Sequence, residues 1–294
     1  MPETGLLHAL RTLDRPRGSR SIALALGRWH VVLDGLDDAL ANALSRRWNG
    51  FIVPADGVAA ARVLRVVRGA DPLWLPHWRL FERYRIEGTV EDGTPFARSY
   101  HFALAPDPGG GTWRLALADE PDERVERIVE NVARFVLARL AAEEGGFALH
   151  GAGVLRDGRA YVFAGPSRSG KSTAVALSAP WPSLGDDFAV LVPGGPSWLT
   201  PALPFDSSEE APPKPRGDLH PVAGIWRLYQ AAEAKLETVA PTIAAASLMG
   251  CAAFPWAMPD LSESILEHVR RYVDGAVFAH LHFRKAPDFW DLLE

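Results

Sequence analysis

Residues 161–173 carry the sequence Tyr-Val-Phe-Ala-Gly-Pro-Ser-Arg-Ser-Gly-Lys-Ser-Thr. An apolar run, 161–164, leads into a loop that begins and ends with glycine, and a helix-compatible run follows Thr173. This order of strand, glycine loop and helix is the context that the phosphate-loop pattern G-x-x-x-x-G-K-[ST] requires. The stretch therefore predicts an α/β fold organised around a phosphate site.

The residue types in this loop suit a nucleotide with its metal. Glycines let successive backbone N–H groups curl round an anion, and the start of the following helix adds a positive dipole end. Lys171 would reach the β- and γ-phosphates, and the Ser172 hydroxyl would bind Mg²⁺. A glycine-rich turn that matches by chance is the alternative. We expect ATP and Mg²⁺ as ligands, with the nucleotide held by Gly165, Pro166, Ser167, Arg168, Ser169, Gly170, Lys171, Ser172 and Thr173.

The composition is that of an ordinary globular protein. The 294 residues suit one large domain or two smaller ones, with 48% apolar and 23% charged residues. The net charge of −5 gives no basic excess, so nucleic acid is not an expected partner. Cys251 alone forms neither an internal disulfide nor a cysteine zinc site, which suits a reducing cytoplasm. No apolar run approaches the roughly 18 residues of a membrane span, so we expect a cytoplasmic protein without a membrane partner.

The hydrophobic pattern predicts two domains. Residues 1–120 show short period-two runs and a hairpin signal at 91–94, which indicate an α+β domain whose first ~20 residues are disordered. The clearest helix, 121–140, then marks the start of a second domain at 121–294. Periodicity leaves 61–67 open between a strand and a short helix.

In the second domain, a hairpin over 148–164 precedes the phosphate loop, and 183–192 is expected to be one strand with two acids near its start. The polar, proline-rich segment 206–221 is either a plain mobile connection or a lid or substrate loop.

Three further residues bear on the reaction. Asp186 and Asp187 lie fifteen and sixteen positions beyond Lys171. Phosphoryl transfer to a hydroxyl needs an acid to hold Mg²⁺ and a base or positioning group. Two solvent-facing acids at a turn are the alternative. His150 precedes the hairpin that feeds the loop and is able to orient or charge a carboxylate, although the residues alone favour a satisfied core histidine.

Taken in order, these motifs resemble the kinase domain of the HPr kinase/phosphorylase family. The resemblance rests on His150-Gly151, on the loop 165–173 and on the run 185–191, and it extends from about residue 148 to the C-terminus. It is closer to HPr-kinase-related proteins that carry a different N-terminal domain. It implies a P-loop kinase domain of the HPr-kinase type, preceded here by a small α+β domain, and an assembly that is often oligomeric.

The resemblance also implies roles. Ser172 and Asp187 would hold Mg²⁺, Asp186 would accept the proton of the acceptor hydroxyl with His150 beside it, and Lys171 would bind phosphate. The two aspartates remain interchangeable between these jobs. Arg168 departs from the family, which commonly has a small residue there. Lys214, Arg216 and Arg227 are candidates for the segment that supports the reverse reaction of the family.

The expected activity is therefore ATP- and Mg²⁺-dependent transfer of the γ-phosphate to a hydroxyl, with a serine on a protein or peptide partner as the expected acceptor. The N-terminal domain differs from that of the HPr-acting enzymes, so the resemblance does not extend to HPr as the acceptor. Two alternatives stand beside this one: a small-molecule kinase or NTPase, and a non-catalytic nucleotide-binding module. His280 and His282 share one strand face, where a structural role is favoured over a metal site.

Overall fold

A computed structural model describes residues 5–59, 61–76, 84–206, 214 and 217–293. Its contacts divide the chain into two compact units. The first unit comprises Met1–Ala133 together with Phe254–Ser262, and the second comprises Arg134–Ala253 and Glu263–Glu294. The division differs from the expected boundary at 120/121, because helix α3 (Val125–Glu143) runs from the first unit into the second and a late segment returns to the first.

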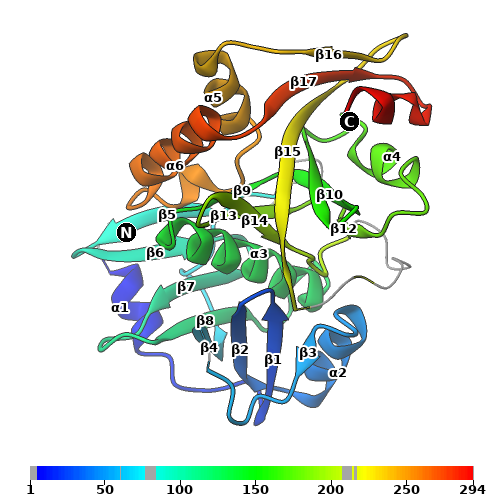
Figure 1. Cartoon of the computed structure of the whole chain (residues 1–294). Helices are drawn as coiled ribbons and strands as arrows, with labels where there is room; N and C mark the ends of the chain where they lie inside the picture. Colours follow the sequence, from blue (N-terminus) through cyan, green and yellow to red (C-terminus); the bar gives the residue numbers. More distant parts are fainter. Residues whose placement is uncertain (1–4, 60, 77–83, 207–213, 215–216, 294) are drawn as a thin grey trace. The chain divides into compact units, whose positions relative to one another are not determined.

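The first unit is built on a mixed sheet that, within the described residues, has eight strands in the order β3-β1-β2-β4-β8-β7-β6-β5 (Figure 1). The strand β4 pairs in parallel with β2 and β8, which settles 61–67 as strand, and the remaining pairs are antiparallel. The expected hairpin at 91–94 joins β5 to β6. The strands are β1 (Arg20–Leu26), β2 (Trp29–Leu36), β3 (Ile52–Val53), β4 (Arg62–Gly69), β5 (Glu87–Glu91), β6 (Thr94–Arg98), β7 (Phe102–Pro106) and β8 (Thr112–Ala118).

Helices α1 and α2 accompany this sheet in the described part of the chain. In α2 (Asp38–Arg47) the Asp37 side chain caps the first turn by accepting from Leu40 N at 2.8 Å. The segment expected to be disordered instead contains α1 (Leu6–Arg11), whose Leu7 and Leu10 are buried against the sheet. The expectation was wrong for this segment because its basic residues obscured the apolar side chains. Residues 1–4 lie outside the described part of the chain.

The second unit holds a mixed sheet in the order β12-β10-β11-β15-β14-β13-β9, with β17 also paired to β15 and β16 to β17 among the described residues. The strands β11, β15 and β17 are mutually parallel, so their carboxyl ends meet at one edge. The expected hairpin turn at Asp157-Gly158 joins β10 to β11. The strands are β9 (Phe147–Leu149), β10 (Gly151–Arg156), β11 (Arg159–Ala164), β12 (Ser183–Gly185), β13 (Ala189–Gly194), β14 (Ser197–Pro201), β15 (Leu219–Gln230), β16 (Lys235–Glu237) and β17 (Phe278–Phe283).

Helices cover both faces of β15 and β17 (Figure 1). On one face α4 (Lys171–Ala176) and the 3₁₀ turn η2 (Pro287–Leu292) pack on a core that includes Phe163, Trp226 and Phe283. On the other face Ser247 of α5 (Pro241–Met249) contacts His280 of β17, and α6 (Ser262–Gly275) follows α5. The second unit is therefore a layered α/β structure, which confirms the α/β class.

The strand expected over 183–192 is interrupted. β12 ends at Gly185, and β13 begins only at Ala189. Gly185 has a φ of 147°, a value that favours glycine, and the chain bends there. Asp186 and Asp187 therefore lie in a bend and not on an extended strand, so the alternation of sides expected for a strand does not apply to them.

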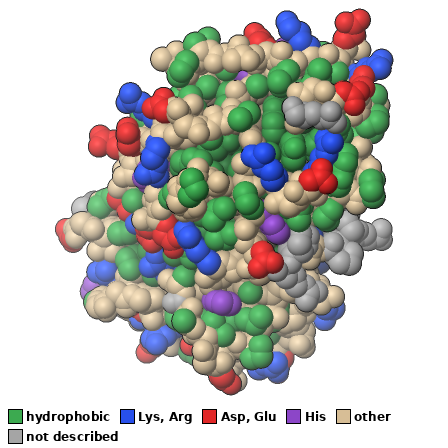
Figure 2. All heavy atoms as spheres, in the orientation of Figure 1, with side chains coloured by type: hydrophobic (Ala, Val, Ile, Leu, Met, Phe, Trp, Pro, Cys, Tyr) green, Lys and Arg blue, Asp and Glu red, His purple; other side chains and the backbone are tan. Residues whose placement is uncertain are grey.

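Charged side chains of both signs are interspersed over the face drawn in Figure 2. No helix among the described residues has the length and apolar character needed to cross a membrane.

Candidate functional site

The glycine loop joins β11 to α4 at the carboxyl edge of the parallel strands. Gly170 has a φ of 106° and Arg168 a φ of 66°, so two residues of the loop are left-handed. A side chain at Gly170 would meet the Phe283 ring at 2.6 Å. The loop shape thus depends on glycine at one of these positions and tolerates arginine at the other.

Lys171 points its amine back into this loop. Its Nζ donates to Gly165 O at 3.0 Å and to Pro166 O at 3.1 Å, and it lies 3.9 Å from Asp187 Oδ1. The residue is only 6% exposed. Its hydrogen bonds to carbonyl oxygens direct the amine toward the loop, where an anion would bind.

The two aspartates approach different partners on α4. Ser172 Oγ donates to Asp186 Oδ2 at 3.2 Å, whereas Asp187 lies beside Lys171. The side chains of Lys171, Ser172, Asp186 and Asp187 therefore lie together at the loop. The pairing supports Asp186 rather than Asp187 as the carboxylate beside Ser172, the reverse of the assignment made from the resemblance.

His150 lies between β9 and β10 and is fixed through its main chain. Its N–H donates to Cys251 O at 2.8 Å, and its carbonyl accepts from Gly165 N at 3.1 Å. The residue is exposed, so it is not a core histidine. Desolvation by the surrounding protein still lowers the pKa of His150 below 6.5, against the opposing charge of Asp187. A neutral imidazole thus lies near Asp187 at the start of the loop.

The residues present fit a nucleotide phosphate and Mg²⁺. Ser169 Oγ is buried and has no hydrogen-bond partner among the described residues, which leaves a hydroxyl for a ligand inside the loop. A side chain at Gly165 would meet Ser169, so the close backbone turn requires glycine. Magnesium commonly takes one or two carboxylates and completes its shell with phosphates and waters, which suits Ser172 with a single aspartate.

The model of one protein family, described as SynChlorMet cassette protein ScmC, matches residues 116–279, more than half of the chain. The chain belongs to the ScmC family. The matched segment runs from β8 to β17 and contains the glycine loop, His150 and both aspartates. No curated protein shows significant sequence similarity to this ScmC-family chain.

The two histidines of β17 in this ScmC-family chain meet an acid that the sequence did not indicate. β16 pairs with β17 and brings Glu237 Oε2 within 3.0 Å of His282 Nε2 and 3.8 Å of His280 Nδ1. Ser247 Oγ lies 3.0 Å from His280 Nε2. In the described part of the chain no His, Cys, Asp and Glu side chains gather in a group that could hold a metal ion. The histidines have hydrogen-bonding roles here.

The polar segment 206–221 is only partly described. Residues 207–213 and 215–216, including Arg216, lie outside the described residues. The two alternatives for this segment, a plain connection or a lid, are therefore not tested. Lys214 is described: its Nζ donates to Leu203 O at 2.6 Å and pairs with Asp206 at 2.5 Å. Lys214 therefore holds the base of this segment near Gly185.

Sequence reasoning missed two contacts of the site. Gln230, the last residue of β15, donates from Nε2 to Arg168 O at 2.8 Å. Cys251 accepts from His150 through its carbonyl and not its thiol. Neither contact has a local sequence signal, because each joins segments that only the sheet order brings together.

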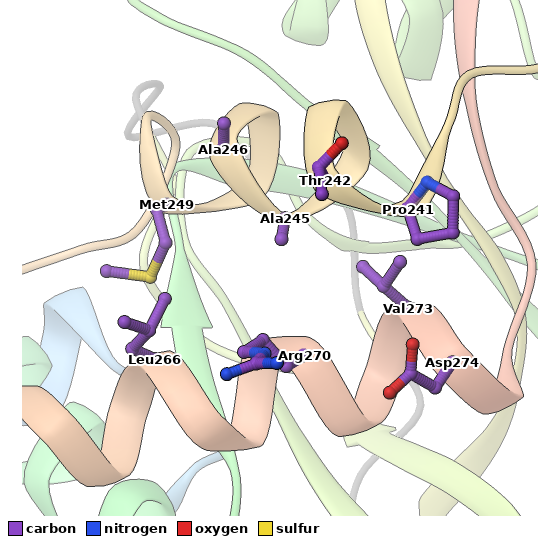
Figure 3. A pocket seen from close by; sticks show the side chains of 9 residues that line it. All are labelled: Pro241, Thr242, Ala245, Ala246, Met249, Leu266, Arg270, Val273 and Asp274. Atoms are coloured by element: carbon purple, nitrogen blue, oxygen red, sulfur yellow. The ribbon is translucent and has the colours of Figure 1, made fainter.

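A separate cavity of about 480 Å³ lies between α5 and α6 (Figure 3). Met249 of α5 and Leu266 of α6 point toward each other across it. None of the site residues predicted from the sequence lines this cavity. Its lining consists of Pro241, Thr242, Ala245, Ala246, Met249, Leu266, Arg270, Val273 and Asp274.

Proposed function

We propose that this ScmC-family protein is an ATP- and Mg²⁺-dependent phosphotransferase with a P-loop kinase domain of the HPr-kinase type. The observation that carries the proposal is the convergence of Lys171, Ser172, Asp186 and Asp187 on one glycine loop. A bare nucleotide binder does not need a second carboxylate beside the lysine. The resemblance of 148–294 to HPr-kinase-related proteins supports the same reaction class.

The chain's own residues have distinct tasks in this proposal. Lys171 and the loop N–H groups hold the β- and γ-phosphates, while Ser172 and Asp186 hold Mg²⁺. The metal ion neutralises charge on the phosphate oxygens when bound. Asp187 accepts the proton of the acceptor hydroxyl, with the neutral His150 near it. The acceptor oxygen bonds to the γ-phosphorus, the bond from that phosphorus to the bridging oxygen breaks, and ADP leaves.

The acceptor that we propose is a serine hydroxyl on a protein or peptide, because the HPr-kinase type acts on such a group. The experiment is incubation with γ-labelled ATP and Mg²⁺, together with the proteins and peptides encoded by neighbouring genes. Labelled acceptor is expected with the unaltered protein and not with Asp187→Asn or Lys171→Met. Labelling that persists in both variants refutes the proposed site.

The same assay separates the proposal from a non-catalytic nucleotide-binding module. A module binds ATP, labels no acceptor and consumes no ATP. A small-molecule kinase or NTPase consumes ATP without labelling any protein or peptide. Failure of the purified protein to bind ATP would overturn the proposed function as a whole.

A further inference from the structure

Arg227 lies at the same sheet edge as the glycine loop, on the strand next to the one that feeds it. β15 is parallel to β11, and Arg227 is paired with Ala164, the last residue before Gly165. Ligands of open α/β sheets bind beyond the carboxyl ends of the strands. Arg227 Nη1 lies 3.5 Å from Ser247 O, so the side chain is on the α5 face, opposite α4.

The guanidinium of Arg227 has no paired carboxylate among the residues that the structure describes. Its Nε is buried and has no hydrogen-bond partner among the described residues. In the same part of the chain, no carboxylate is within ion-pair distance of Arg227, whose guanidinium contacts Ser247 O at 3.5 Å and the Tyr229 ring at 5.3 Å. A buried polar atom such as this Nε is costly to leave without a hydrogen-bond partner unless a ligand supplies one. The surroundings of Arg227 therefore suit a bound oxyanion.

Arg227 and Lys171 both lie near enough to Cys251 for their charges to act on its thiol. Burial raises the pKa of the Cys251 thiol, and the charges of Arg227 and Lys171 both oppose that rise. Cys251 O accepts from His150 N, and His150 O accepts from Gly165 N. A short chain of main-chain contacts thus links the neighbourhood of Arg227 to the first residue of the loop.

We propose that Arg227 binds the γ-phosphoryl group of the nucleotide from the α5 face, as a second cation beside Lys171. This inference rests on the proposed function. In phosphoryl transfer, negative charge is spread over the equatorial oxygens of the transferred group, and an arginine supplied by the same chain stabilises it. The Tyr229 ring packs against the guanidinium, and Ser247 O accepts a hydrogen bond from its Nη1, so both residues hold it in place.

The test compares two nucleotides that differ in the γ-phosphate. Calorimetry measures the dissociation constants of Mg²⁺-ADP and of Mg²⁺ with a non-hydrolysable ATP analogue, with no acceptor present. Arg227→Gln is expected to weaken the triphosphate analogue about tenfold and ADP less than about threefold, because hydrogen bonds to charged groups contribute about 1.5–3 kcal/mol. Arg227→Lys keeps the charge without the planar fork, so its dissociation constant for the triphosphate analogue should lie between those of the unaltered protein and of Arg227→Gln.

Arg270→Gln is the matched control. Arg270 lies on α6 with a 66% exposed side chain and is 3.9 Å from Glu267, away from the loop. Its removal should leave both dissociation constants unchanged. Circular dichroism and thermal melts check that each variant is folded. If Arg227→Gln does not fold, Arg227→Lys takes its place in the comparison.

Three outcomes overturn the inference. Equal weakening of both nucleotides means that Arg227 supports the loop structure only. An unchanged preference for the triphosphate means that the oxyanion at Arg227 is not the γ-phosphate, and an acidic group on the acceptor then becomes its source. Failure of the unaltered protein to bind either nucleotide overturns the proposed function as well, which is a distinct result.

Discussion

Gln230 Nε2 donates a 2.8 Å hydrogen bond to the main-chain oxygen of Arg168. Arg168 is one of few non-glycine residues with positive φ in the described chain, at 66°. A non-glycine residue in the left-handed region is strained by about 1–2 kcal/mol. The hydrogen bond from Gln230 at the end of β15 thus holds Arg168 in its strained, left-handed conformation.

Gln230→Ala is predicted to weaken nucleotide binding about fivefold, because a net hydrogen bond contributes about 0.5–1.5 kcal/mol. Arg168→Gly in the same background should restore affinity, since glycine adopts positive φ without steric cost. Arg168→Ala is the control: it removes the guanidinium and keeps the strain. Calorimetry with Mg²⁺-ADP measures each constant. Equal restoration by alanine and glycine would show that strain is not the cause.

Lys171→Met should abolish stabilisation by nucleotide while leaving the fold intact without it. A ligand at one hundred times its dissociation constant stabilises a protein by about 2.7 kcal/mol. Differential scanning fluorimetry with and without Mg²⁺-ATP therefore gives a clear shift for the unaltered protein and none for the variant. A shift of the same size in Lys171→Met would place the phosphates elsewhere.

Asp186→Asn and Asp187→Asn should lose different functions, the first the response of ATP binding to Mg²⁺ and the second phosphate transfer. Because Asp186 contacts Ser172, its amide variant is expected to bind ATP with little response to Mg²⁺. Because Asp187 lies beside Lys171, its amide variant should bind Mg²⁺-ATP normally and transfer no phosphate. Titrating Mg²⁺ into each variant with ATP present distinguishes them. The opposite pattern would restore the assignment made from the resemblance.

Gly146→Ala is predicted to destabilise the second unit by about 1–3 kcal/mol, the usual cost of overpacking a core. A methyl group there would meet Leu191 O and would lie 3.0 Å from Ala141 O, both main-chain atoms. Gly275→Ala is the matched control, because nothing lies within 4 Å of the added carbon. Urea unfolding compares the two, and equal stabilities would contradict the packing at Gly146.

Stability should fall as the pH drops below 6.5, partly through His280. Burial lowers the pKa of His280, against the opposing charge of Glu237 and together with the charges of Arg227 and His282. Because the unfolded chain binds the proton more readily than the folded one, stability is present above pH 6.5 and is lost as the pH falls through the lowered value. His280→Gln should reduce the change in melting temperature between pH 7.5 and pH 5.5. If the melting temperature of His280→Gln depends on pH as strongly as that of the unaltered protein, His280 does not contribute to the loss of stability.

Local patterns in the sequence were sufficient for most of the second unit. The glycine loop and the hairpin at Asp157-Gly158 were predicted because each has its own turn signal. The four polar side chains of the loop region were also identified. The sequence left open which aspartate accompanies Ser172, since that choice depends on a bend at Gly185 that an apparently continuous strand pattern conceals.

Contacts between distant segments could not be predicted. Glu237 meets His282 only because β16 pairs with β17, and a three-residue strand has too few positions for a period-two signal. Gln230 and Arg168 are likewise joined by sheet order. At the N-terminus, arginines and an acid hid a short helix whose two buried leucines are explained only by the sheet beneath them.

The segment Phe254–Ser262 belongs to the first unit although the chain on both sides of it belongs to the second. Its turn η1 (Pro255–Ala257) packs on β5 so closely that a side chain at Gly88 would meet the Ala257 carbonyl. Domains generally fold as units during synthesis, beginning at the N-terminus. Here the ribosome releases β5 long before residue 262, so the first unit remains incomplete until most of the second has been translated.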